Sequence, residues 1–324
     1  MIRPRARWSR PHEAAGLLWD HLRQLWPGPG IWLPVPFMVW SAAWLAVGKG
    51  RLEHVIFLIG MPLLAYTNTW TRRLLLGLLP MAFLGLVYDG MRWFDKLGVT
   101  PDRVHVCDLR EVDMNIASAT VNGERGTVHD WIQAHTSTAL DIMAAIPYGT
   151  FLFVAVGFAV FLYVKDYERM RLFGWAFFFL NLAGFATYHL YPAAAPWYFH
   201  TYGCAVDLTA HPSEGPNLAR VDVMLGVPYF RSFYGRAADV FGAVPSLHVS
   251  YPMLIILFGW PVLRWPGRIL AIVFLVTMCT AAVYLDHHWI IDVILGLAYT
   301  VAVHAAIMVV VNLRQLRAPS EVMS

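Results

Sequence analysis

The stretch FGAVPSLHVSYPML, residues 241–254, places one histidine between a polar segment and an apolar one. The residues after His248 stay apolar, which predicts a membrane-spanning helix over 249–263. The imidazole is therefore expected at the mouth of that helix, where lipid headgroups meet hydrocarbon. An ionisable side chain near membrane depth is costly and is usually there for function.

The composition of the whole chain is that of a membrane protein. Of its 324 residues, 58% are hydrophobic and 14% are charged, and the mean hydropathy is +0.52. A soluble domain would carry roughly 25% charge. No strand-like alternation persists, so the predicted fold is an all-α polytopic membrane helix bundle. The third span is short and contains Pro80. About eight spans are predicted, at residues 31–47, 54–69, 74–88, 139–164, 173–191, 249–263, 269–285 and 289–313.

The basic residues predict how these spans are oriented. The short segments TRR, KDYERMR and RWPGR carry Lys and Arg, and short basic loops lie on the cytoplasmic side. Both termini are then cytoplasmic, and the long polar segments 89–138 and 192–247 lie outside. The outside face is periplasmic, extracellular or lumenal. The net charge of +3 reflects this topology and does not indicate binding to nucleic acid.

Five regions follow from these boundaries. Residues 1–30 are Arg-rich with an apolar stripe, which predicts a basic amphipathic helix on the cytoplasmic surface, with a solvated basic tail as the alternative. Residues 31–88 hold the N-terminal spans, and 89–138 form an outside polar loop that could cap the membrane core. Residues 139–313 form that core, and 314–324 form a cytoplasmic tail.

Three cysteines bear on the compartment. Cys107 and Cys204 fall in the two outside segments, whereas Cys279 lies in a span. An oxidising outside face would permit a Cys107–Cys204 disulfide. Two free thiols are the alternative.

A second histidine motif, YLDHHWIID at residues 284–292, precedes the last span. His288 and Asp292 are four residues apart, so on a helix they would share one face. A carboxylate there would accept the imidazole N–H, fix its tautomer and make the other ring nitrogen more nucleophilic. The topology brings His248 and His288 to the same membrane face at similar depth.

The two motifs together resemble the second and third signatures of the type 2 phosphatidic acid phosphatase superfamily. GAVPSLH and YLDHHWIID are most similar to its inositol phosphorylceramide synthase branch, as are AAIPYG at 144–149 and YPAAAPWY at 191–198. The resemblance covers about residues 139–313 and implies that this region is a catalytic core of six helices. Ala281 and Ala282 stand where the phosphatases carry Ser-Arg, and their first motif is missing. The synthase branch lacks both features as well.

The resemblance implies a mechanism without metal or cofactor. His288 would be the nucleophile, Asp292 its orienting partner, and His248 first general acid and then general base. The implied enzyme moves a phospho-headgroup, phosphoinositol from phosphatidylinositol, to the hydroxyl of a lipid such as ceramide through a phosphohistidine. The alternative is a lipid phosphate or polyprenyl-diphosphate phosphatase with water as acceptor. A phospholipid donor and a lipid acceptor are the expected partners; a protein partner is not indicated.

Several residues are candidates for binding the substrate. The phosphate needs positive charge, and Arg236 is preferred over Arg220 and Arg231 because it lies twelve residues before His248. His287 adjoins His288 but would point elsewhere on a helix, so it is expected to support the site from behind. The remaining candidates are Ser246 of the PSLH motif and the aromatic residues Tyr191, Trp197 and Tyr198.

Two other classes of protein are alternatives to the enzyme. A haem or metal protein could use His248, His287, His288 and Asp292 as ligands. A transporter could use His–Asp pairs as a proton relay, but the motifs lie at span ends and no inverted repeat is visible.

Overall fold

The computed structural model describes residues 11–92, 94, 98–210, 217–235 and 239–321. The chain divides into two compact units, residues 1–79 and 80–324, and helix α4 (Thr69–Met91) runs from the first into the second. The first unit also holds α1 (Pro11–Leu25), the short 3-10 helix η1 (Pro29–Trp32), α2 (Val35–Ala46) and α3 (Leu52–Tyr66).

In the first unit, α2 packs against α3. The indole of Trp26 donates to the carbonyl of Ala65 over 2.9 Å, and the hydroxyl of Tyr66 donates to the carbonyl of Ile31 over 2.6 Å. Leu17 and Leu18 of α1 are exposed within this unit. The predicted N-terminal helix is present as α1. Its place on a membrane surface stays a prediction.

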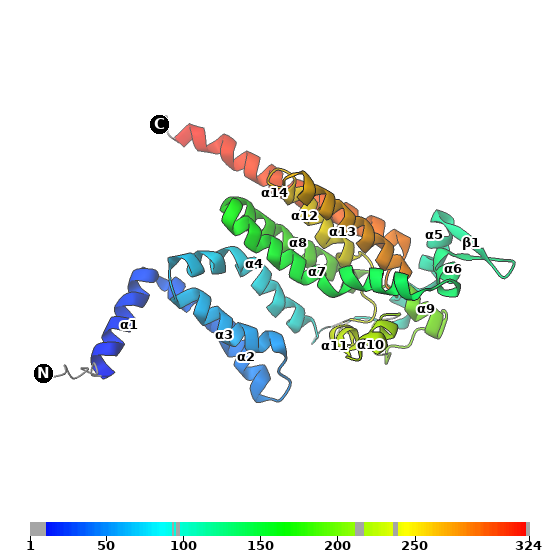
Figure 1. The fold of residues 1–324 in the computed structure, drawn as a ribbon, viewed down its shortest axis with the longest axis horizontal. Helices are drawn as coiled ribbons and strands as arrows, with labels where there is room; N and C mark the ends of the chain where they lie inside the picture. Colours follow the sequence, from blue (N-terminus) through cyan, green and yellow to red (C-terminus); the bar gives the residue numbers. More distant parts are fainter. Residues whose placement is uncertain (1–10, 93, 95–97, 211–216, 236–238, 322–324) are drawn as a thin grey trace, which may run out of the picture. The chain divides into compact units, whose positions relative to one another are not determined.

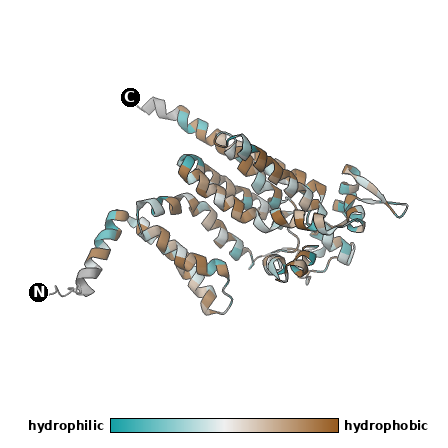
Figure 2. Cartoon of the chain, in the orientation of Figure 1, coloured by the Kyte–Doolittle hydropathy of each residue, from teal (hydrophilic) through white to brown (hydrophobic). Residues whose placement is uncertain are grey.

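The second unit is a helix bundle built on five membrane helices together with the second half of α4. These are α7 (Thr138–Lys165), α8 (Tyr167–Leu190), α12 (Leu247–Gly259), α13 (Trp265–Tyr284) and α14 (Ile290–Glu321). They run alongside one another, and α12 packs against the other four (Figure 1). Their apolar surfaces contrast with the polar segments at one end (Figure 2).

The described residues contain six helical segments that are long and apolar enough to cross a membrane, and two shorter apolar helices, α3 and α12. The predicted all-α membrane bundle is thus confirmed. Two lengths differ from the prediction. The span containing Pro80 is not short, because α4 has 23 residues, and α12 has only 13. The helix α12 begins at Leu247, so His248 lies inside its first turn.

The contact between α12 and α14 leaves no room for a side chain at Gly296. The Ser250 hydroxyl contacts both the Ser246 carbonyl and the Gly296 carbonyl, each at 2.9 Å. A Cβ atom on Gly296 would lie 2.3 Å from the carbonyl oxygen of Ser246. Because that atom belongs to the backbone, the helix ends would have to move apart.

We expect Gly296→Ala to destabilise the protein by about 1–3 kcal/mol, as other over-packed cores do, and to displace the residues just before His248. Thermal melting of the detergent-purified protein measures the effect. The matched control is Gly157→Ala in α7, where a Cβ would meet nothing within 4 Å. Equal melting temperatures for the two variants would contradict this packing.

The polar segment 89–138 is folded where the structure describes it, from residue 98 onward. It contains η2 (Pro101–Arg103), α5 (Cys107–Ile116), the strands β1 (Ser118–Val121) and β2 (Glu124–Thr127), and α6 (Val128–Ala134). The strands pair antiparallel through an Asn122–Gly123 turn in which both residues have positive φ. An Asn-Gly pair between strand-forming residues is a strong hairpin signal. This short hairpin was not predicted from the sequence, and the fold class remains all-α.

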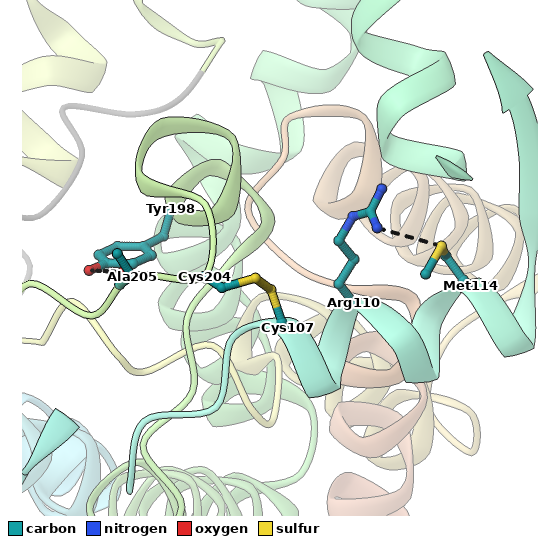
Figure 3. Close-up of a disulfide and its surroundings, with 6 residues drawn as sticks. All are labelled: Cys107, Arg110, Met114, Tyr198, Cys204 and Ala205. Atoms are coloured by element: carbon teal, nitrogen blue, oxygen red, sulfur yellow. Dashed lines mark hydrogen bonds between the residues drawn. A yellow bond between two sulfur atoms is a disulfide. The ribbon is translucent and has the colours of Figure 1, made fainter. Parts of the chain in front are cut away.

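The second polar segment contains α9 (Pro196–Tyr202), α10 (Ala219–Leu225) and α11 (Tyr229–Tyr234). It meets the first one through a backbone bridge between His105 and Ala193, and Ala193 also pairs with Gly242 of its own segment. A disulfide joins Cys107 at the start of α5 to Cys204 just after α9, with 5.5 Å between the Cα atoms (Figure 3). Of the two alternatives for these cysteines, the structure has the disulfide.

Removing this disulfide is expected to lower the melting temperature. It closes a segment of 97 residues. A cross-link over about 100 residues stabilises the folded state by about 4.7 kcal/mol at most, because it lowers the entropy of the unfolded chain. The test is a Cys107→Ser, Cys204→Ser double variant, compared with Cys279→Ser, since Cys279 is a free thiol. An unchanged melting temperature in the double variant would show that the bridge does not stabilise the fold.

Candidate active site

The two histidines of the sequence motifs meet in the structure. His248 lies in the first turn of α12, and His288 lies in the turn between α13 and α14. His248 Nδ1 is 3.0 Å from His288 Nε2. The backbone holds the two motifs together, because the N–H of Ser246 donates to the carbonyl of Asp292 over 3.0 Å. His288 is buried and His248 is partly buried.

The other nitrogen of His288 contacts a backbone carbonyl. His288 Nδ1 is 2.9 Å from the carbonyl oxygen of Ala243 and 3.6 Å from Asp292 Oδ2. A backbone carbonyl can only accept, so Nδ1 carries the proton and Nε2 presents its lone pair toward His248. This tautomer suits a nucleophile at Nε2.

The expected relation between His288 and Asp292 is corrected in one respect. The helix α14 begins at Ile290, so His288 precedes it and the two residues do not share a helix face. Asp292 instead accepts the N–H of Trp289 through Oδ2 over 2.9 Å. Its carboxylate is fully buried and close to His288 without being its nearest partner.

Aromatic side chains surround the histidine pair. Tyr148, from the AAIPYG motif, stacks on His248 with 4.5 Å between ring centroids. The hydroxyl of Tyr234 lies 3.4 Å from His248 Nε2 and donates to the carbonyl of Tyr148 over 2.8 Å. The motif had pointed to the region of Tyr148, whereas nothing in the sequence distinguished Tyr234.

His287 belongs to the same cluster. It is not on a helix, and its ring lies 5.0 Å from that of Tyr148 and 5.1 Å from that of Tyr234. Burial lowers the pKa of His287 to about 3, so its ring is neutral. The expectation that it points away along a helix was wrong, because the YLDHHW segment forms a turn at this point.

The YPAAAPWY segment supports the site through its backbone. The carbonyl of Ala193 accepts the N–H of Ala243, and the carbonyl of Ala194 accepts the indole N–H of Trp289 over 2.9 Å. Ala243 provides the carbonyl that fixes His288. The segment therefore holds the histidine in place from behind.

The three aromatic candidates of that segment have different surroundings. Tyr198 is fully buried, and its hydroxyl accepts the N–H of Asp207 over 2.7 Å. Tyr198 therefore packs in the core of the polar segments, and its contact with a substrate stays a prediction. Tyr191 is 36% exposed and stacks on His105. Trp197 is partly buried, and its backbone N–H donates to the carbonyl of Asp286.

The polar candidates for phosphate binding are resolved only in part. Arg220 makes a bidentate ion pair with Asp141, at 2.7 and 2.9 Å, which accounts for its charge. Arg236 lies outside the described residues. Ser246 is fully buried, and its hydroxyl has no hydrogen-bond partner among the described residues. Within the same part of the chain, no group of three or more His, Cys, Asp or Glu residues is arranged to hold a metal ion.

The histidine pair, its surroundings and the motifs agree with the comparison to known proteins. The family model described as the PAP2 superfamily matches residues 118–306, more than half of the sequence. The chain belongs to the PAP2 superfamily. The match begins at the hairpin of the polar segment, before the region 139–313 that carried the resemblance.

Three of the similar proteins are named as synthases of phosphoinositol dihydroceramide or inositol phosphorylceramide. Phosphoinositol dihydroceramide synthase of Bacteroides thetaiotaomicron is 34% identical over 264 residues, which cover 81% of this chain and 85% of that protein. Inositol phosphorylceramide synthase of Candida albicans is 33% identical over 165 residues, 50% of this chain and 34% of that protein. The inositol phosphorylceramide synthase catalytic subunit of Saccharomyces cerevisiae is 31% identical over 173 residues, 52% of this chain and 42% of that protein.

The two fungal proteins are matched over less than half of their own length. No solved structure matches the chain. The comparisons confirm the expected branch of the superfamily and the enzyme class, a phosphotransferase of the inositol phosphorylceramide synthase type.

Proposed function

We propose that this PAP2-superfamily protein transfers phosphoinositol from phosphatidylinositol to the hydroxyl of a ceramide-type lipid through a phosphohistidine at His288. The observation that carries the proposal is the 3.0 Å contact between His248 Nδ1 and His288 Nε2, with the other nitrogen of His288 tied to the Ala243 carbonyl. The inositol phosphate group and the ceramide-type acceptor follow the names of the relatives, and phosphatidylinositol as the donor follows from the family resemblance.

The first step forms a covalent intermediate. The lone pair of His288 Nε2 attacks the phosphorus, and the bond from phosphorus to the diacylglycerol oxygen breaks. Protonated His248 gives its proton to that oxygen, so neutral diacylglycerol leaves. The phosphoinositol group is then bonded to His288.

The second step regenerates the enzyme. The hydroxyl of the acceptor gives its proton to His248 as its oxygen attacks the phosphorus, and the bond from phosphorus to nitrogen breaks. His248 ends protonated and His288 neutral, as at the start. Splitting one displacement into two lets each use the same pair of imidazoles.

The burial of the site favours a lipid hydroxyl over water as acceptor. His288 is only 4% exposed, and Tyr148, which stacks on His248, is fully buried. Excluding water prevents hydrolysis of a reactive intermediate. This supports transfer over the alternative phosphatase activity.

The disulfide supports placing the site on the outside face. It ties the two polar segments together at the histidine end of the bundle, and disulfides persist in oxidising compartments. We propose that the site faces the periplasm, the cell exterior or a lumen, with both termini cytoplasmic. The bundle that includes residues 139–313 would then be the catalytic core.

The direct test supplies the detergent-purified protein with phosphatidylinositol and a fluorescent ceramide, and follows phosphorylated ceramide and free phosphate together. We expect phosphorylated ceramide and no phosphate release. A separate incubation with phosphatidate tests the alternative. Phosphate release there, with no ceramide product in the first assay, would replace the proposal by a lipid phosphatase.

A further inference from the structure

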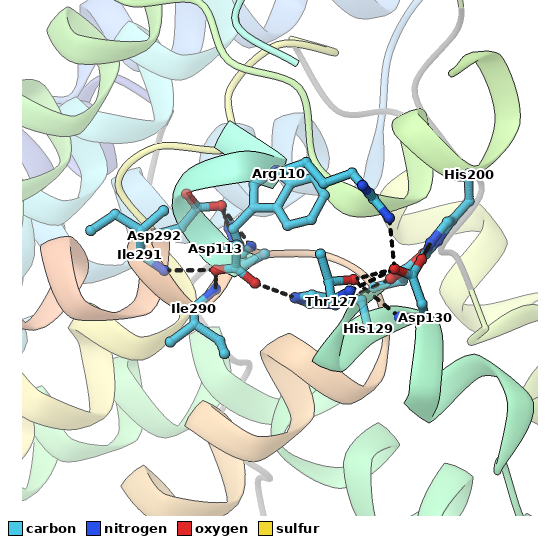
Figure 4. Close-up of polar contacts among 12 residues, drawn as sticks. Arg110, Asp113, Thr127, His129, Asp130, His200, Ile290, Ile291 and Asp292 are labelled. Carbon is cyan, nitrogen blue, oxygen red and sulfur yellow. Dashed lines mark hydrogen bonds and ion pairs between the residues drawn. The ribbon is translucent and has the colours of Figure 1, made fainter. Parts of the chain in front are cut away.

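A chain of alternating acidic and basic side chains lies beside the histidine pair. It joins α5, α6 and α9 to the turn that carries His288 (Figure 4). None of its members belongs to the motifs that indicated the chemistry, except Asp286. In order, the chain consists of Asp113, His129, Asp286, His200, Asp130 and Arg110.

The inner end of this chain holds the start of α14. Asp113 is fully buried, and its Oδ1 accepts the N–H groups of Ile290 over 2.7 Å and Ile291 over 3.3 Å. The first N–H groups of a helix have no partner within it, and a carboxylate there is also favoured by the helix dipole. Asp113 therefore fixes the turn of helix that carries Asp292.

The middle of the chain holds the other end of the same segment. His129, with no exposed surface, lies with Nε2 3.7 Å from Asp113 Oδ2 and with Nδ1 3.2 Å from Asp286 Oδ1. Asp286 has a φ of +66°, in the left-handed region that, apart from glycine, mainly Asn and Asp adopt. Contacts to its side chain therefore stabilise the turn that leads into His287 and His288.

The outer end supplies compensating charge. Burial would lower the pKa of His200, but hydrogen bonds to Asp130 at 3.0 Å and Asp286 at 2.5 Å outweigh it and raise the pKa to about 9. Burial would raise the pKa of Asp286, but its contacts with His129 and His200 lower it instead. Acidic and basic side chains alternate along the chain, so each carboxyl group lies next to a histidine or an arginine.

We propose that Asp113 and Asp286, joined through His129, are positioning residues that hold the segment 286–292 at both ends and so set the place of the nucleophile. The inference rests on the proposed function for its kinetic consequence. Because the contacts come from α5 and α6, these two helices of the polar segment 89–138 help to position the active-site residues.

The test compares Asp113→Ala with Asp113→Asn. The alanine removes the acceptor for both N–H groups, whereas the asparagine keeps an oxygen that can accept them. We expect kcat to fall about 100-fold in the alanine variant, the scale of a misplaced catalytic group, with KM for phosphatidylinositol within about twofold. The asparagine variant should recover kcat to within about tenfold of the wild type.

Two further variants separate positioning from general stability. His129→Gln removes the link between the two carboxylates and should also lower kcat with little change in KM. Asp166→Ala removes a carboxylate that caps the start of α8, where Asp166 Oδ1 accepts the N–H of Arg169 over 3.0 Å. This control should leave kcat within about twofold of the wild type.

Amide hydrogen exchange provides a readout that does not depend on the reaction. Exchange at residues 290 and 291 should accelerate in Asp113→Ala and stay slow in Asp166→Ala. Unchanged exchange there would overturn the proposal even if the wild type proved inactive with these lipids. Faster exchange with an unchanged kcat would also overturn it, as would equal losses of kcat in the alanine and asparagine variants. If Asp113→Ala does not fold, Asp113→Asn and His129→Gln carry the same comparison.

Discussion

Replacing His288 with glutamine is expected to lower the rate of phosphoinositol transfer by at least roughly 10⁴-fold, the scale seen when a covalent nucleophile is removed. Glutamine keeps polar atoms in the turn but cannot present the lone pair that Nε2 directs toward His248. The measurement is the initial rate of phosphorylated ceramide formation from phosphatidylinositol in detergent.

The matched control is His304→Gln. His304 lies in α14, as part of the same bundle, and its ring contacts Phe258. This variant should keep its rate within a few-fold of the wild type. A His288→Gln protein that elutes like the wild type on size exclusion and still transfers phosphoinositol at a comparable rate would contradict the assignment of the nucleophile.

Replacing His248 with asparagine should slow transfer from phosphatidylinositol by about 10²–10⁴-fold, the usual contribution of general acid–base catalysis. The loss has two sources, because His248 serves the leaving oxygen in the first step and the acceptor hydroxyl in the second. A donor whose leaving group needs no proton separates them.

The separating experiment uses a nitrophenyl ester of inositol phosphate as donor. Nitrophenolate leaves without a proton, so the His248→Asn variant should release one equivalent of nitrophenol per enzyme at a rate near that of the wild type. Turnover onto ceramide should remain slow, because the second step still needs the base. If the burst of nitrophenol were as slow as transfer from phosphatidylinositol, His248 would not be the acid of the first step.

The fold was largely predictable because membrane spans have a strong signal in sequence. The described helices include eight apolar ones, as expected, since hydrocarbon requires continuous apolar stretches. The hairpin around Asn122 and Gly123 was missed because two four-residue strands do not stand out from the polar loop. The length of α4 was underestimated because the predicted span, 74–88, left out Arg72, Arg73 and Asp89, which the helix includes.

The reacting residues were also predictable, but their support was not. The spacing of His248 and His288 placed both at one end of the bundle. The sequence did not show that α14 begins at Ile290. In the structure, Asp292 caps this helix start by accepting the N–H of Trp289. The sequence therefore predicted correctly that His288 and Asp292 lie close together, but the reason was wrong, because His288 is not part of the helix.

The buried chain around His129 could not be inferred from sequence. His129 lies in the outside polar segment without a recognisable motif around it, yet Asp113 of α5 and Asp286 of the turn before α14 lie against it. Such a contact depends on tertiary folding, and no local pattern reports it. The role of Arg236 as a phosphate cation stays a prediction.

The most direct test of the proposed phosphohistidine at His288 is to trap this covalent intermediate. The protein is incubated with phosphatidylinositol and no acceptor, quenched with alkali and digested, and the peptide containing residues 284–292 is analysed by mass spectrometry. We expect an acid-labile phosphoinositol adduct on His288 that disappears when ceramide is added and is absent in His288→Gln. Rapid transfer with no adduct on any residue, or an adduct on a different residue, would contradict it.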